Sequence, residues 1–266
     1  MIKRIFCDLD GTLYNEGVSK KDSDAIKRAE ANGLEFNIAT GRIFKQGYNM
    51  IKNDVDLKGY FICENGSFIY DSSLNIIFKG TLTDDISRRI ITKFDEIEKN
   101  KHAEAQLYFK YKGDTVIMDE GNAFKHYSKD YVYDPDFSKK ESFDNMIGNI
   151  GVACEDPKEL ERIEVLLKEE FENDTDIYFS SELTLNIVPK GVSKKAAIDY
   201  VIEIEGIKPE EVATIGDSPN DISMLEGYEY GFAMEKARAD VKKAASYVSA
   251  NVSDAIDKII KINSEK

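Results

Sequence analysis

The stretch FCDLDGTLYN, residues 6–15, decides how this chain can fold. An apolar run rich in isoleucine and phenylalanine leads into it, and Gly11 ends that run, so we predict a buried strand over residues 2–9. Asp8 and Asp10 stand at its C-terminal end. Residues two positions apart point to the same side of an extended chain, so the two carboxylates are expected to serve one site.

Strands and helices alternate after this stretch. Residues 19–33 are predicted to form a helix, because Ser19 and Asp22 have capping-box spacing and Gly33 is a typical stop. Strands are predicted at LEFNIA (34–39), which Thr40 follows, and at GYFICENG (59–66). This alternation favours an α/β fold with a parallel, Rossmann-like sheet covered on both faces, whose ligands bind at the C-terminal ends of the strands.

The pattern changes near position 83. A charged helix (84–100), alternating strands (105–121), a strand (149–156), a helix (157–174) and a hairpin (176–188) suggest an antiparallel α+β domain. The first pattern resumes with a helix at 193–205 and a strand at 211–216. We therefore predict a discontinuous core over 1–82 and 189–266, interrupted by an inserted cap over 83–188.

Composition restricts the partners. The formal net charge is −14 and the pI about 4.8, which disfavours nucleic acids and anionic membranes. No apolar run reaches the ~18 residues of a membrane span. Cys7, Cys63 and Cys154 are widely spaced in apolar stretches, as expected of reduced thiols. We expect a cytoplasmic protein with no evident obligate protein partner.

A second acidic motif, GDSPND (216–221), follows the strand at 211–216. If both strands are central and parallel, Asp217 converges with Asp8 and Asp10. Carboxylates ~4 Å apart repel by roughly 4 kcal/mol per pair at an effective dielectric of about 20, so the cluster needs a cation or bound protons. Oxygen ligands suit Mg²⁺ better than zinc. Thr40, Gly41 and a helix-start Lys194 add anion-binding groups, which together indicate phosphoryl transfer.

Four motifs in this order resemble the haloacid dehalogenase superfamily of phosphohydrolases. They are DxDGT at 8–12, a strand-end threonine in TGR at 40–42, a helix-borne lysine in PKGVSKKAA at 189–197, and GDxxND at 216–221. The long insertion and the approach to the lysine look like the Cof-type subfamily with its type IIB cap. One departure is EK at 235–236, where many Cof-type sequences carry Gly-Asn.

The resemblance implies a mechanism. Asp8 is the expected nucleophile, Asp10 the general acid and base, and Thr40 and Lys194 hold the phosphoryl group. The implied residues are, for the metal, Asp8, Asp10 through its carbonyl, Asp217 and Asp221, and, for phosphate or substrate, Leu9, Gly41, Arg42 and Asn220. The implied ligands are Mg²⁺ and a small phosphorylated metabolite, and the cap is expected to act as the lid that sets specificity.

Other interpretations stay open. Lys195 could replace Lys194, Arg42 could pair with surface carboxylates, and Gly66 is interpreted as a turn residue. A mutase like the phosphomannomutases, a phospho-aspartate receiver module and a catalytically silent scaffold are the rival functions. A cysteine phosphatase is excluded, because no arginine lies six positions after any cysteine. A histidine nucleophile or a serine triad in the core has no base, since His102 and His126 fall in the predicted cap.

Overall fold

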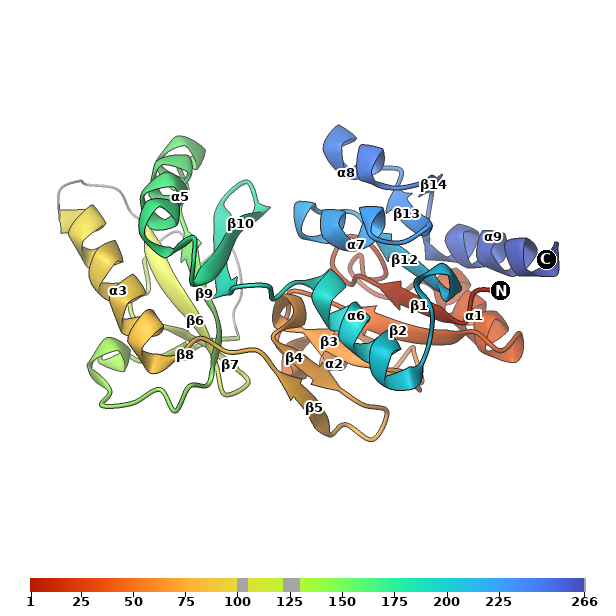
Figure 1. Cartoon of the computed structure of the whole chain (residues 1–266), viewed down its shortest axis with the longest axis horizontal. Coiled ribbons are helices and arrows are strands. Elements are labelled where there is room, and N and C mark those ends of the chain that lie inside the picture. Colours follow the sequence, from red (N-terminus) through yellow and green to blue (C-terminus); the bar gives the residue numbers. More distant parts are fainter. Residues whose placement is uncertain (100–104, 122–129, 266) are drawn as a thin grey trace. The chain divides into compact units, whose positions relative to one another are not determined.

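The computed structural model of the protein describes residues 1–99, 105–121 and 130–265. The chain divides into two compact units (Figure 1). One comprises Met1–Phe78 with Ser193–Lys266, and the other comprises Lys79–Val192. The junctions between these units differ from the predicted ones by a few residues at each crossing. His102 and His126 lie outside the described residues.

The first unit, the core unit, is built on an eight-stranded sheet of order β14-β13-β12-β1-β2-β3-β4-β5. Its strands from β14 to β3 run parallel, and β4 pairs antiparallel with β3. The strands are β1 (Arg4–Cys7), β2 (Glu35–Ala39), β3 (Phe61–Cys63), β4 (Phe68–Tyr70), β5 (Ile76–Lys79), β12 (Val212–Gly216), β13 (Tyr230–Met234) and β14 (Tyr247–Ser249). The parallel sheet predicted from the alternating pattern is confirmed.

Helices cover this sheet. They are α1 (Lys20–Ala31), α2 (Phe44–Ile51), α6 (Lys194–Glu205), α7 (Ile222–Glu226), α8 (Ala239–Ala244) and α9 (Val252–Ser264), with 3-10 turns η1 (Glu64–Gly66), η3 (Pro209–Glu211) and η4 (Pro219–Asp221). Helix α1 begins as its sequence predicts, because Ser19 Oγ accepts a hydrogen bond of 3.1 Å from the N–H of Asp22. Helix α6 buries Ala197, Ile198 and Val201 in one apolar cluster with β1, β3 and α7. This packing anchors the start of α6 over the sheet.

The second unit, the cap unit, has a six-stranded sheet of order β10-β11-β9-β6-β7-β8. Its pairs are antiparallel except β7 with β8. Its elements are α3 (Asp84–Lys99), β6 (Gln106–Tyr111), β7 (Asp114–Ile117), β8 (Val132–Tyr133), η2 (Phe137–Lys139), β9 (Ile147–Ala153), α5 (Pro157–Phe171), β10 (Thr175–Ser181) and β11 (Thr184–Pro189). Helices α3 and α5 pack on it, with Ile163 and Leu167 fully buried.

Some elements were not predicted. Strands β4, β5 and β8 have only two to four residues each, too few to show a periodic pattern. No described helix is long and apolar enough to cross a bilayer. The three cysteines are buried, and none of them, all within the described part of the chain, forms a disulfide.

Candidate active site

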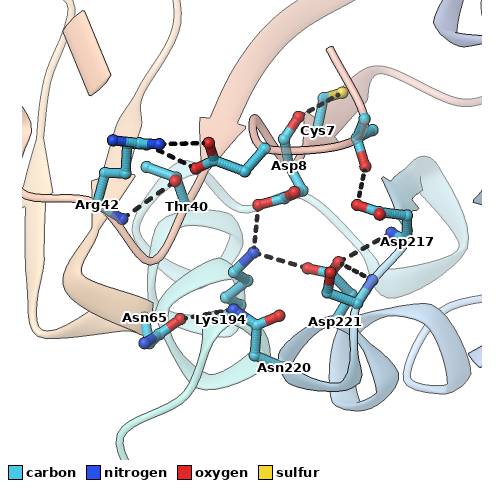
Figure 2. A network of polar contacts seen from close by, with 12 residues as sticks. Cys7, Asp8, Thr40, Arg42, Asn65, Lys194, Asp217, Asn220 and Asp221 are labelled. Atoms are coloured by element: carbon cyan, nitrogen blue, oxygen red, sulfur yellow. Dashed lines mark hydrogen bonds and ion pairs between the residues drawn. The ribbon is translucent and has the colours of Figure 1, made fainter. Parts of the chain in front are cut away.

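Four neighbouring strands of the core unit, β12, β1, β2 and β3, run parallel and end at one edge of the sheet. Asp217, Asp8, Thr40 and the η1 turn follow these four ends directly. The start of α6 brings Lys194 to the same place, so motifs far apart in sequence meet (Figure 2). This convergence follows from the strand order, because the C-terminal ends of parallel strands share an edge.

Lys194 is the central cation of the site. Its Nζ lies 2.6 Å from Oδ1 of Asp8 and 2.6 Å from Oδ1 of Asp221, and the residue is 1% exposed. Lys195 instead forms an ion pair of 2.6 Å with Asp199, at a partly exposed position. Consecutive residues of a helix point in different directions, so Lys194 points into the site and Lys195 points away from it. Of the two lysines that the sequence offered, Lys194 is the one that contacts Asp8.

Burial controls the ionisation of this group. It raises the pKa of Asp8 well above the ordinary value of a carboxyl, although the Lys194 ammonium opposes the shift. Burial also disfavours the charged form of Lys194, but Asp221 and Asp8 together raise its pKa above the ordinary value. The lysine therefore stays charged at neutral pH and compensates two buried carboxylates.

Asp221 is fully buried and uses both carboxylate oxygens. Oδ1 accepts from Lys194, and Oδ2 accepts from the backbone N–H groups of Asp217 and Ser218, each at 2.9 Å. Its contacts hold the ammonium and brace the turn that carries Asp217. The predicted role of Asp221 as a metal ligand stays a prediction, and these contacts show that its carboxylate also orients Lys194.

The acidic group fits a divalent cation. Asp8, Asp217 and Asp221 each place a carboxylate oxygen within 4.8 Å of the others, while Lys194 is the cation hydrogen-bonded to the group. Burial raises the pKa of Asp217 above its ordinary value, although a hydrogen bond of 2.7 Å from the Thr12 hydroxyl opposes the shift. An all-oxygen donor set with excess negative charge suits Mg²⁺, and a bound cation would relieve the repulsion.

Asp10 lies outside this group. Its carboxylate is held by the Arg42 guanidinium through two hydrogen bonds of 2.7 Å, one to each oxygen. The alternative that Arg42 pairs with a surface carboxylate agrees with this contact, because Asp10 is exposed, and that carboxylate belongs to the predicted general acid. The hydrogen bond from Arg42 to Asp10 also raises the pKa of the guanidinium.

The remaining predicted residues differ in what they can contact. Thr40 is fully buried, and its Oγ1 accepts from the N–H of Arg42 at 3.1 Å. Asn220 donates through Nδ2 to Asn65 at 2.9 Å. Gly41 lies beside that pair. The Leu9 side chain is fully buried, so only its backbone could reach a phosphate.

Sequence reasoning assigned no role to two participants, Thr12 and Asn65. Thr12 binds Asp217, although it was quoted only as part of the first motif. Lys236, part of the departure at 235–236, binds Asn15 Oδ1 at 2.7 Å, and its charge opposes the rise that burial causes in the pKa of Asp217. Asn65 lies in the stretch 59–66 that was predicted as a strand, and no role was predicted for it.

Comparison with known proteins agrees with this geometry. The sequence profile of the haloacid dehalogenase-like hydrolases matches residues 5–260. The chain is 30% identical over 263 residues to the 5-amino-6-(5-phospho-D-ribitylamino)uracil phosphatase YcsE of Bacillus subtilis, a match that spans 98% of this chain and 95% of the relative. It is 26% identical to an HMP-PP phosphatase of Serratia proteamaculans, over 88% of this chain and 84% of the relative.

The fold also has solved counterparts. A crystal structure of a Thermotoga maritima protein superposes with a TM-score of 0.80 at 24% identity, covering 97% of each chain. The resemblance deduced from the four motifs, including the Cof-type layout, is confirmed. The chain belongs to the haloacid dehalogenase-like hydrolases.

Proposed function

We propose that this protein is a Mg²⁺-dependent phosphatase that hydrolyses phosphomonoesters of small metabolites through an aspartyl-phosphate on Asp8. One observation carries the proposal. A buried lysine holds one oxygen of a strand-end aspartate, 2.6 Å away, beside further carboxylates that fit a divalent cation. That arrangement combines a nucleophile, charge compensation and a place for a phosphoryl group.

Asp8 is suited to attack phosphorus. Its Oδ1 is fixed by Lys194, and its position directly after β1 is set by the sheet. In the proposed first step an oxygen of Asp8 forms a bond to phosphorus while the bond from phosphorus to the leaving oxygen breaks. Lys194 offsets the charge that the incoming phosphate adds to the site. Thr40 and the backbone at Gly41 lie at the neighbouring strand end, where they can hold phosphoryl oxygens.

Asp10 is suited to move the proton. It is two residues beyond the nucleophile and partly exposed, so it can reach a leaving group and water. It donates a proton to the leaving oxygen in the first step. In the second step it takes a proton from the attacking water, the bond between Asp8 and phosphorus breaks, and inorganic phosphate is released.

Asp8, Asp217 and the backbone carbonyl of Asp10 would hold Mg²⁺, with Asp221 orienting Lys194 beside them. When bound, the cation supplies charge that offsets the repulsion between the carboxylate nucleophile and the phosphate. Thr12 keeps the Asp217 carboxylate in place through its hydrogen bond. The raised pKa values of Asp8 and Asp217 are consistent with a site that is incomplete without a cation.

Small phosphorylated metabolites are the proposed substrates. The relatives described above are phosphatases named for a ribityl phosphate and for HMP-PP. Their names favour water as the final phosphoryl acceptor over a mutase-like return of phosphate to a sugar. Sugar phosphates and related phosphomonoesters are therefore the first class to test.

The experiment measures phosphate release from a panel of sugar phosphates, a ribityl phosphate and a chromogenic phosphomonoester, with Mg²⁺ and with chelator. Wild type is compared with Asp8→Asn and with Asp56→Asn, whose aspartate is exposed. We expect turnover that requires Mg²⁺, falls at least roughly 10³-fold in Asp8→Asn and is unchanged in Asp56→Asn. Folded wild-type protein that binds Mg²⁺ yet releases no phosphate from any substrate would contradict the proposal.

A further inference from the structure

Asn65 sits inside the candidate site, in the η1 turn that follows β3. It is 1% exposed and has φ 58° and ψ 26°, a left-handed conformation that asparagine adopts more readily than most other residues with a side chain. Its Oδ1 accepts a hydrogen bond of 2.9 Å from Nδ2 of Asn220. Figure 2 shows the two carboxamides meeting beside Lys194.

The Asn65 backbone is tied to the threonine motif as well. Its N–H donates to the carbonyl of Thr40 at 3.0 Å. A Cβ added at Gly41 would lie 3.0 Å from Asn65 Oδ1 and 3.6 Å from Asn220 Nδ2, so the turn after β2 packs closely on the carboxamide pair. Asn65 therefore links the strand end that carries Thr40 to the turn that carries Asn220.

The approach of α6 depends on the same turn. Gly66 has φ 108°, and a Cβ there would collide with the carbonyl of Ser193, the residue that caps α6. The absence of a side chain allows the helix start, with Lys194, to lie against the Asn65 turn. The conformation of η1 therefore affects the position of Lys194 as well as the hydrogen bond between Asn65 and Asn220.

Two polar atoms of the Asn65 and Asn220 carboxamides form no hydrogen bond with the described residues. These atoms, Asn65 Nδ2 and Asn220 Oδ1, are both buried. An unsatisfied buried polar group destabilises the folded state, and so does a left-handed residue that carries a side chain. Costs of this kind persist where a particular side-chain orientation is needed. Here that orientation points the Asn220 amide nitrogen at Asn65 and leaves the Asn220 oxygen able to accept a hydrogen bond.

We propose that Asn65 is a positioning residue for phosphoryl transfer, which acts by holding the Asn220 carboxamide so that its Oδ1 can accept a hydrogen bond from a ligand in the site. The proposal rests on the proposed phosphatase function. Asn65 itself touches no reacting atom. Its effect passes through Asn220, so the two residues are expected to be energetically coupled.

The test is a double-mutant cycle with Asn65→Gly, Asn220→Ala and the double variant. Glycine readily adopts the left-handed backbone conformation and lacks the side chain that carries the carboxamide, so we expect the variant to fold. We expect Asn65→Gly to lower kcat/KM about tenfold, and the double variant to be no slower than Asn220→Ala alone. Asn65→Asp keeps the acceptor oxygen and is expected to retain more activity than Asn65→Gly.

Three results would overturn the proposal. The first is a lower melting temperature in Asn65→Gly with unchanged kcat/KM, which would mean a merely structural role. The second is additivity of the two losses in the double variant, which would mean that Asn65 acts independently of Asn220. The third is an Asn220 side-chain amide NMR resonance, recorded without substrate, that does not shift in Asn65→Gly. That last measurement needs no turnover, so a failure of the proposed function would be recognised separately.

Discussion

Arg42 holds both carboxylate oxygens of Asp10, through Nε and Nη2, at 2.7 Å each. The two side chains are 36% and 47% exposed, so the ion pair contributes little to stability, about 0–1 kcal/mol. Its two-point geometry does restrict the direction in which Asp10 points. The arginine is therefore better explained as a support for the proposed acid and base than as a stabilising contact.

Arg42→Lys is expected to lower kcat/KM about tenfold while the free energy of unfolding changes by less than about 0.5 kcal/mol. A lysine keeps the charge but cannot hold both oxygens at once. The loss should be largest for substrates with poor leaving groups, because these depend most on the proton from Asp10. Kinetics on a series of aryl phosphates would measure this. An equal loss for all leaving groups would show that Arg42 serves binding alone.

Lys194→Met is expected to destabilise the protein by about 3–5 kcal/mol, because Asp8 and Asp221 lose the ammonium that compensates them in a buried place. Turnover should fall by roughly 10²–10³-fold or more. Urea unfolding and steady-state kinetics measure the two effects.

Lys195→Met is the matched control, since its ion pair with Asp199 is partly exposed and spans one helical turn. We expect a change of about 0.3–0.5 kcal/mol and normal turnover for this variant. Equal effects of the two substitutions would contradict the assignment of Lys194 as the cation of the site.

Asp217→Asn is expected to be more stable than wild type at neutral pH in chelator. Burial raises the folded-state pKa of Asp217 above the unfolded value of about 3.9, so folding disfavours its ionised form. This loss of folding stability is fully present at pH values above the folded-state pKa of Asp217. It disappears as the pH falls below the unfolded-state pKa. The stability difference between variant and wild type should therefore shrink as the solution is acidified.

Added Mg²⁺ should reverse this order, because a cation that binds only the folded wild type stabilises it by mass action. Urea unfolding with chelator and with Mg²⁺, at neutral pH and near pH ~4, measures all four conditions. A variant that is less stable than wild type in chelator at neutral pH would be evidence against a buried, cation-dependent Asp217.

Gly11→Ala is expected to weaken Mg²⁺ binding at least roughly tenfold. Gly11 has φ 80°, and an added Cβ would overlap Oδ2 of Asp217 and lie 3.0 Å from its Cγ. Gly33→Ala is a close control, because its φ is 76° but nothing lies within 4 Å of the added atom. Both variants should lose about 1 kcal/mol of stability through backbone strain. Calorimetric titration with Mg²⁺ should then separate them, and similar affinities in the two variants would contradict the expectation.

Local sequence features were sufficient for much of the core. The apolar run before Asp8, the Ser19 and Asp22 spacing and the stop at Gly33 each act over a few residues, and each has the predicted consequence. The longer elements of the cap unit could be predicted for the same reason. Strands β4, β5 and β8 could not, since short strands exist only where a neighbouring strand offers hydrogen bonds.

The sequence by itself determined which residues end the strands, and hence that Asp8, Thr40 and Asp217 share one edge of a parallel sheet. Only the tertiary structure decided that Lys194 and not Lys195 faces Asp8, that Arg42 holds Asp10, and that Asn65 meets Asn220. The physical reason is the distance along the sequence over which each kind of interaction acts. Strand ends follow from local patterns of apolar and turn residues, whereas side-chain partners depend on helical phase and on distant turns that become neighbours only when the sheet assembles.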